Sequence, residues 1–180
     1  RSVSETKSTK ESSINFSKNI GKVGSYQSQN FGETIDISSD GKVVVIGHPY
    51  TNPNTFRGKG LVEIYKYNGT SWEQMGSDIV SDTDDHNFGK HVSIGNNGST
   101  IAISATGNQY VSGRKGWVYV YKYLSCGWEQ VGETITGDAV SGNYDNTSSH
   151  YGYYMHPVSL SDDGKTLAIG SPGYQPISGT

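Results

Sequence analysis

Short apolar segments recur along the chain and predict β-strands. Residues 33–38 alternate isoleucine with polar residues, which is typical of a strand with one buried face. Residues 42–47 are β-branched and apolar on both faces, so we expect a strand buried between two layers. A third strand is predicted at 61–67, and a fourth begins near Trp72. No segment has a 3.6-residue apolar period long enough to predict a helix.

Glycine-containing turns separate these strands. Asp40 and Gly41 lie between the first and second strands, and Asn68 and Gly69 lie between the third and fourth. Asp-Gly and Asn-Gly are strong hairpin signals because glycine adopts a positive φ without steric cost. We therefore expect four antiparallel strands with tight turns at these two places.

Two segments of the chain repeat without a gap. Residues 60–76 and 116–132 are offset by 56 positions, and nine of the 17 aligned residues are identical. A second block runs from Phe-Gly or Tyr-Gly through Asp-Gly or Asn-Gly into an apolar strand, and it occurs three times. Its copies begin at Phe31, Phe88 and Tyr151, with spacings of 57 and 63 residues. Such repetition predicts an array of similar units.

The repeated unit predicts an all-β fold. A four-stranded antiparallel sheet that recurs every ~40–60 residues is typical of a β-propeller blade. A sheet that is apolar on both faces needs a neighbour on each side, and adjacent blades provide one. Trp72 and Trp128 are expected to pack between adjacent blades.

The predicted organisation has five parts and holds about two and a half blades. They are a polar tail or linker at 1–13, the last strand of a preceding blade at 14–30, blade repeats at 31–87 and 88–150, and a partial blade at 151–180. A closed propeller typically has 4–8 blades. Three alternatives remain: an incomplete ring from a longer chain, an assembly of several copies, or an open array.

The repeated motifs also point to a family. Phe-Gly is followed by Ile-Ser-x-Asp-Gly and Ala-Ile-Gly, then by Gly-x-Val-x-Val-Tyr-x-Tyr and Trp-x-Gln-x-Gly, and residues 159–172 match best. This pattern resembles the FG-GAP-type repeats of the integrin alpha-chain propeller. It is especially similar to tandem arrays in surface proteins of algae, protists and bacteria. The resemblance covers roughly residues 16–172 and implies a propeller fold, which serves adhesion, carbohydrate binding, scaffolding and some enzymes.

The cofactor prediction departs from that family. Integrin-type blades often carry an Asp-x-Asp-x-Asp-Gly calcium loop, but the turns at 38–41, 96–98 and 161–164 lack its alternate carboxylates. We therefore do not expect calcium at these turns. The densest acidic stretch is a candidate calcium site instead, with a solvated loop as the alternative; its carboxylates are Asp82, Asp84 and Asp85.

Charge and hydropathy exclude some partners. The 180-residue chain has 14 basic and 17 acidic residues, a net charge of −3, which argues against a nucleic-acid partner. No apolar run approaches 18 residues, so we predict no membrane span.

Four N-glycosylation sequons favour an extracellular or cell-surface location. They begin at Asn15, Asn68, Asn97 and Asn146. Two of them fall in predicted hairpin turns, where a glycan can be carried. The single cysteine, Cys126, cannot form an internal disulfide and favours a reducing compartment, so the two signals oppose each other.

A tyrosine cluster is the candidate ligand contact. It surrounds the long loop of the third unit, where aromatic rings serve glycan or protein recognition, with packing between blades as the alternative; its members are Tyr144, Tyr151, Tyr153 and Tyr154. The chain has neither a Gly-x-Ser-x-Gly elbow nor a phosphate-binding loop, and no catalytic residue is predicted.

The leading functional hypothesis is a non-enzymatic extracellular repeat protein. It acts in adhesion or as a structural subunit of a surface filament or coat, with other protein chains or copies of itself as partners. The alternatives are a carbohydrate-binding propeller module that takes glycans, and a fragment of a propeller enzyme.

Overall fold

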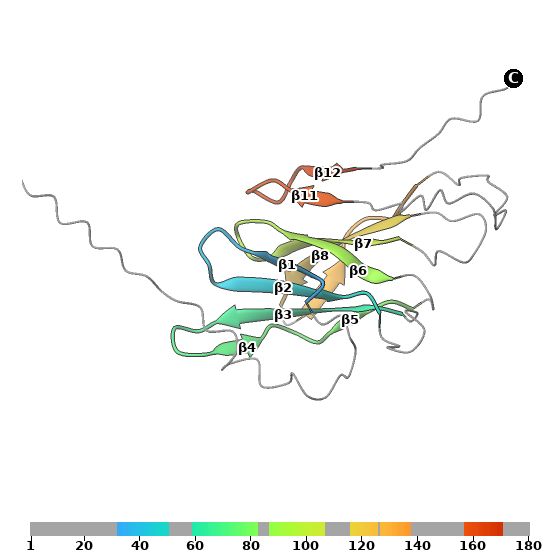
Figure 1. The fold of residues 1–180 in the computed structure, drawn as a ribbon. Helices are drawn as coiled ribbons and strands as arrows, with labels where there is room; N and C mark the ends of the chain where they lie inside the picture. Colours follow the sequence, from blue (N-terminus) through green and yellow to red (C-terminus); the bar gives the residue numbers. More distant parts are fainter. Residues whose placement is uncertain are drawn as a thin grey trace, which may run out of the picture.

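The computed structural model describes residues 32–50, 59–82, 87–106, 116–125, 127–137 and 157–170. Within these ranges the chain forms β-strands and no helix, and every pairing between named strands is antiparallel (Figure 1). The prediction of an all-β chain built from antiparallel sheets is confirmed.

The first repeat is a sheet with four strand positions. β1 (Thr34–Ile37), β2 (Val43–His48) and β3 (Leu61–Tyr67) are adjacent in that order. The short strands β4 (Trp72–Gln74) and β5 (Ile79–Val80) both pair with β3. They form one outer strand that is interrupted between them, where Gly76 has a φ of +81°.

The second repeat has the same strand order. It contains β6 (Phe88–Ile94), β7 (Thr100–Ala105) and β8 (Trp117–Leu124), and the outer position is again divided between two short strands. These are β9 (Gly127–Gln130) and β10 (Ile135–Thr136), which both pair with β8.

The third repeat is a two-stranded hairpin in the described part of the chain. It consists of β11 (Val158–Leu160) and β12 (Leu167–Ile169), which correspond to the first two strands of the other repeats. The three described sheets do not close into a ring, and the number of blades stays a prediction. The predicted tail at 1–13 and preceding-blade strand at 14–30 lie outside the described residues.

A serine and an aspartate close the first hairpin turn. Ser38 Oγ donates to Asp40 Oδ1 at 2.7 Å, and the Lys42 amide donates to the same oxygen at 3.0 Å. These bonds to the ionised carboxylate hold the pKa of Asp40 below its usual value. Gly41 completes the turn with a φ of +68°.

The same hydrogen bonds recur in the third repeat. Ser161 Oγ donates to Asp163 Oδ1 at 2.6 Å, and the Lys165 amide donates to that oxygen at 3.1 Å. The carboxylates of both turns therefore hold the hairpin backbone, which explains why an aspartate occurs here without a calcium loop.

The main core lies between the first and second repeats. Val45 and Val62 from the first repeat, and Ile101 and Ile103 from the second, have no exposed surface. A smaller cluster of Val44, Ile46 and Tyr65, with Trp72 beside it, lies on the opposite face of the first sheet. Successive residues of β2 are thus buried on opposite faces, as the sequence predicted.

Candidate functional site: the contact between repeats

Successive repeats meet in the same way at both of their described contacts. β6 lies against β1 and β2, and β11 lies against β6 and β7. In Figure 1 the β11–β12 hairpin is on the far side of β6 and β7 from β1 and β2. The first strand of each repeat thus packs on the two inner strands of the repeat before it.

A side-chain acceptor in one repeat binds a backbone amide of the next. Asp36 Oδ2 accepts from the Ile94 amide at 2.9 Å. Ser93 Oγ accepts from the Leu160 amide at 3.0 Å. Both acceptors stand five residues before the hairpin glycine of their own repeat, and both donors stand four residues before theirs. The two contacts therefore use equivalent positions.

The hairpin glycines reproduce this equivalence in their packing. A methyl group on Gly98 would lie 2.6 Å from Cγ2 of Val43, and one on Gly164 would lie 3.1 Å from Cβ of Thr100. Val43 and Thr100 both begin the second strand of their repeats. Each glycine allows its turn to pass directly over the preceding sheet.

The backbones approach closely at the inner strands. A methyl group on Gly47 of β2 would collide with the carbonyl oxygen of Gly89 in β6. One on Gly60 would collide with the carbonyl oxygen of Phe88. Gly60 has a φ of +76° and Gly89 a φ of +88°, so both positions require glycine for conformation as well as for space.

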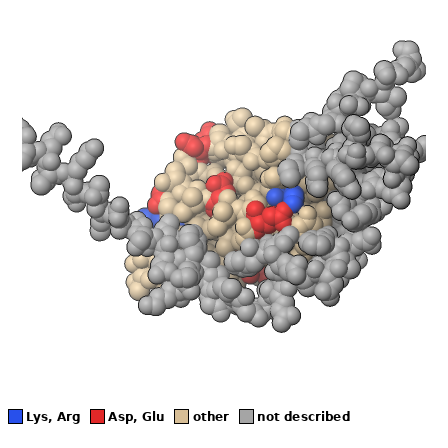
Figure 2. Space-filling model, in the orientation of Figure 1, with Lys and Arg blue, Asp and Glu red and all other residues tan. Residues whose placement is uncertain are grey.

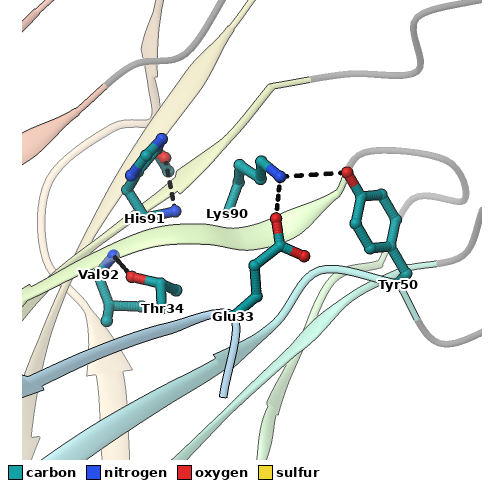
Figure 3. A network of polar contacts seen from close by, with 7 residues as sticks. Glu33, Thr34, Tyr50, Lys90, His91 and Val92 are labelled. Carbon is teal, nitrogen blue, oxygen red and sulfur yellow. Dashed lines mark hydrogen bonds and ion pairs between the residues drawn. The ribbon is translucent and has the colours of Figure 1, made fainter. Parts of the chain in front are cut away.

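An ion pair and a hydrogen bond link the first two repeats near these glycines (Figure 3). Lys90 Nζ on β6 binds the carboxylate of Glu33 and lies 3.2 Å from the hydroxyl of Tyr50. Burial by itself lowers the pKa of Lys90, but the hydrogen bonds with Glu33 and Tyr50 outweigh it, so the pKa is raised. The ammonium also lies 5.1 Å from the centre of the Tyr50 ring.

Aromatic side chains fill the contact at the outer strands. Trp128 Nε1 donates to the carbonyl of Met75 at 2.7 Å, and its ring lies 3.0 Å from the place of a methyl group on Gly76. Trp128 therefore packs between repeats, as the sequence predicted. Trp72 stands at the equivalent position of the first repeat and packs on the face turned away from the second repeat.

One buried polar cluster of the first repeat has no equivalent in the second. His48 Nε2 lies 3.4 Å from Glu63 Oε2, and the Tyr65 hydroxyl donates to that oxygen at 3.3 Å. His48 and Glu63 are each 3% exposed. Burial and the charge of Glu63 raise the pKa of Tyr65 to about 12. The second repeat has Ala105 and Tyr119 where the first has the histidine and the glutamate.

The predicted calcium residues are only partly described. Asp82 follows β5 and is exposed, while Asp84 and Asp85 lie outside the described residues. Among the described residues, no three His, Cys, Asp or Glu side chains are grouped so that they could hold a metal ion. The charge of Asp82 instead contributes to the raised pKa of Tyr119, after burial as the larger cause.

Two predicted glycan acceptors are in turns, as expected. Asn68 Oδ1 accepts from the amides of Thr70 and Ser71, both at 2.9 Å, in the β3–β4 turn. Asn97 Oδ1 accepts from the Ser99 amide at 3.0 Å in the β6–β7 turn. Both asparagines are exposed. Their side chains stabilise the turns through Oδ1, and glycosylation at Nδ2 stays a prediction.

The remaining predicted site residues lie outside the described part of the chain. They are Asn15, Asn146, Tyr144, Tyr151, Tyr153 and Tyr154. Sequence reasoning missed the acceptors Asp36 and Ser93. The available signal was a polar residue at the same place in two repeats, on a strand whose neighbours are apolar.

Comparison with known proteins does not identify a family. No protein-family model matches the chain, and no curated protein matches it. The resemblance to FG-GAP-type repeats therefore stays a prediction. In the described residues, the structure has no helix with the length and apolar character needed to cross a membrane.

Two hairpin glycines provide a matched test of the repeat contact. Gly41 and Gly98 have φ values of +68° and +65°, but among the residues that the structure describes only Gly98 packs on another repeat. We expect Gly41→Ala to cost about 1 kcal/mol, because alanine is strained at positive φ. Gly98→Ala adds a clash with Val43 and should cost at least about 1 kcal/mol more. Chemical denaturation measures both, and equal losses would contradict the packing described here.

A buried tyrosine and a partly buried one predict a loss of stability at high pH. The pKa of Tyr65 is raised to about 12 by burial and Glu63, and that of Tyr121 to about 12 by burial with Tyr119 and Asp82. An unfolded tyrosine ionises near its usual pKa of about 10, so the unfolded state loses protons first. The free energy of unfolding should therefore fall as the pH rises from about 10 to about 12. Absorbance titration at alkaline pH and denaturation across this range test this, and two normal tyrosine titrations would contradict it.

Proposed function

We propose that this protein is a non-enzymatic extracellular repeat protein of the FG-GAP-like propeller type. It acts in adhesion or as a structural subunit of a surface filament or coat. Its repeats pack face to face, and its partners are further copies of itself or other chains with matching faces. Asn68 and Asn97, which are exposed in turns, are the proposed glycan acceptors among the described residues.

The observation that carries this proposal is the equivalence of the two repeat contacts. The acceptors Asp36 and Ser93, and the glycines Gly98 and Gly164, hold corresponding places at the two contacts. A contact that recurs at equivalent positions allows a further unit to bind in the same way. Such an interaction between like units supports assembly more directly than it supports a reaction.

Exposed apolar side chains at both ends of the described array support further stacking. Ile35 and Ile37 are 54% and 41% exposed. Their cross-strand partners are Ile46 and Val44, so they lie on the face of the first sheet turned away from the second repeat. Ile135, on the second repeat, is 44% exposed on a face turned away from the first.

The described surface on the face shown in Figure 2 fits contact with proteins better than contact with polyanions. On the face shown in Figure 2, most described atoms belong to residues other than Lys, Arg, Asp and Glu, and the few charged groups have both signs. The buried side chains of His48 and Glu63 approach each other, with 3.4 Å between Nε2 and Oε2. The tyrosines on which a carbohydrate-binding module depends lie outside the described residues.

The proposal predicts self-association of the chain through its exposed isoleucines. The average mass from light scattering should rise with protein concentration, because copies cover each other's apolar faces. The double variant Ile35→Lys/Ile37→Lys should shift the profile toward the monomer by placing two charges in this contact.

Thr136→Lys serves as the matched control for these variants. Thr136 is exposed on β10 of the second repeat, whereas Ile35 and Ile37 are on the first sheet, so its substitution should leave the mass profile unchanged. A monomer at every concentration, or equal effects of the control and the double variant, would contradict assembly through this face.

A further inference from the structure

Two isoleucines at the same place in successive repeats differ in exposure. Ile79 pairs with Val62, and Ile135 pairs with Val118, 56 residues further along the chain in both cases. Ile79 is 8% exposed because it is part of the core against the second repeat, whereas Ile135 is 44% exposed. The second repeat therefore has an uncovered apolar position where the first repeat has a covered one.

The outer strands of the next repeat supply the cover at the first contact. Tyr119, Tyr121 and Trp128, from β8 and β9, pack against the core that contains Ile79. Trp128 also donates its indole N–H to the carbonyl of Met75. Two features thus define the cover: alternate tyrosines on one strand and a tryptophan on the next.

The backbone that accepts the tryptophan side chain in the first repeat has an equivalent in the second repeat. The Met75 amide donates to the Ile64 carbonyl at 2.8 Å, and the Val131 amide donates to the Val120 carbonyl at 2.8 Å. Val131 follows Met75 by 56 residues, so its carbonyl occupies the place that accepts the indole N–H in the first repeat.

The edge of β12 is a second uncovered feature, next to the second repeat. β2 and β7 each pair with a strand on both sides, whereas in the described part of the chain β12 pairs only with β11. Ile169 of β12 is 39% exposed, but Ile103, at the same place in β7, has no exposed surface. An open strand edge beside an apolar surface is suited to the addition of another strand.

We infer that the outer edge of β12, together with Val131 and Ile135, is a docking site for a two-stranded segment of the repeat type. The occupant is an antiparallel hairpin with tyrosines at alternate positions of its first strand and a tryptophan in its second. Its first strand pairs with β12 through backbone hydrogen bonds. Its tyrosines cover Ile135, and its indole N–H donates to the Val131 carbonyl.

The occupant is the segment that would form the next contact between repeats, so this inference rests on the proposed function. Continuity with the first contact identifies the occupant, because residues 60–79 and 116–135 carry this strand pair in the two complete repeats. Residues 116–135, with Cys126→Ser to remove the thiol, provide the probe, because they carry Tyr119, Tyr121 and Trp128.

A synthetic peptide with the sequence of residues 116–135 and Cys126→Ser tests the site on the full 180-residue chain. At a peptide concentration ten times its Kd, hydrogen exchange of the β12 amides should slow by about tenfold, since binding protects the edge strand. A peptide that also carries Trp128→Ala should bind at least about tenfold more weakly, because it loses an aromatic ring of the cover and the indole donor.

Two chain variants locate the contact. Ile135→Lys should weaken peptide binding about tenfold or more, since a lysine in the covered position loses apolar contact and buries a charge. Thr136→Lys is the matched control, because this neighbouring exposed residue points to the other face of the strand, and it should bind as the unchanged chain does. Both positions are exposed, so both variants should fold.

The outcomes separate this inference from the proposed function. Unchanged β12 exchange at saturating peptide overturns the docking site, as does binding that Ile135→Lys leaves intact. If the chain self-associates through Ile35 and Ile37 without any peptide effect, assembly stands and the docking site fails. If the peptide protects β12 while the chain is monomeric at every concentration, the docking site stands and self-assembly fails.

Discussion

The structure depends on the burial of apolar side chains on both faces of each sheet. In β2, Val44 and Val45 point to opposite faces, yet both are buried. A strand of this kind is stable only where another layer covers each face, and the burial of apolar surface drives that packing. A single repeat is therefore not stable without a neighbouring repeat, and the contact between repeats is as important for folding as the hydrogen bonds within each sheet.

Polar groups determine how the apolar faces are aligned. Apolar packing alone tolerates sliding, whereas the bonds from the Ile94 amide to Asp36 and from the Leu160 amide to Ser93 each define one position. The ion pair between Lys90 and Glu33 adds a third constraint at the inner edge. Because side chains alternate between faces, a shift by one residue would turn these groups away from their partners.

The sequence predicts the strands well and the contacts between them less completely. The expected strands at 33–38 and 61–67 correspond to β1 and β3, because alternation and turn glycines are local signals. The division of the outer strand near Gly76 was not predicted, since one glycine does not by itself show that a strand is interrupted; Gly76 and its equivalent Gly132 both have a positive φ. The pairing of Lys90 with Glu33 joins residues 57 positions apart, and no local pattern specifies it.

The buried cluster of His48 and Glu63 is a feature that the sequence repeat does not predict. Both residues are buried in the first repeat, and alignment places Ala105 and Tyr119 at those positions of the second. Their proximity follows from the register of β2 with β3, which a single sequence does not specify. The long loops, which carry most of the predicted ligand and metal residues, lie outside the described residues, so the structure leaves those predictions as they were.

The close backbone approach at Gly47 and Gly89 has a geometric consequence. At Gly47 and Gly89 the backbones of the inner strands come into contact, whereas at the outer strands the rings of Tyr119, Tyr121 and Trp128 lie between the two sheets. Each sheet is therefore joined to the next as a wedge, narrow on one side and wide on the other. A row of such wedges bends toward its narrow side, so an array built with this contact grows along an arc rather than a straight line.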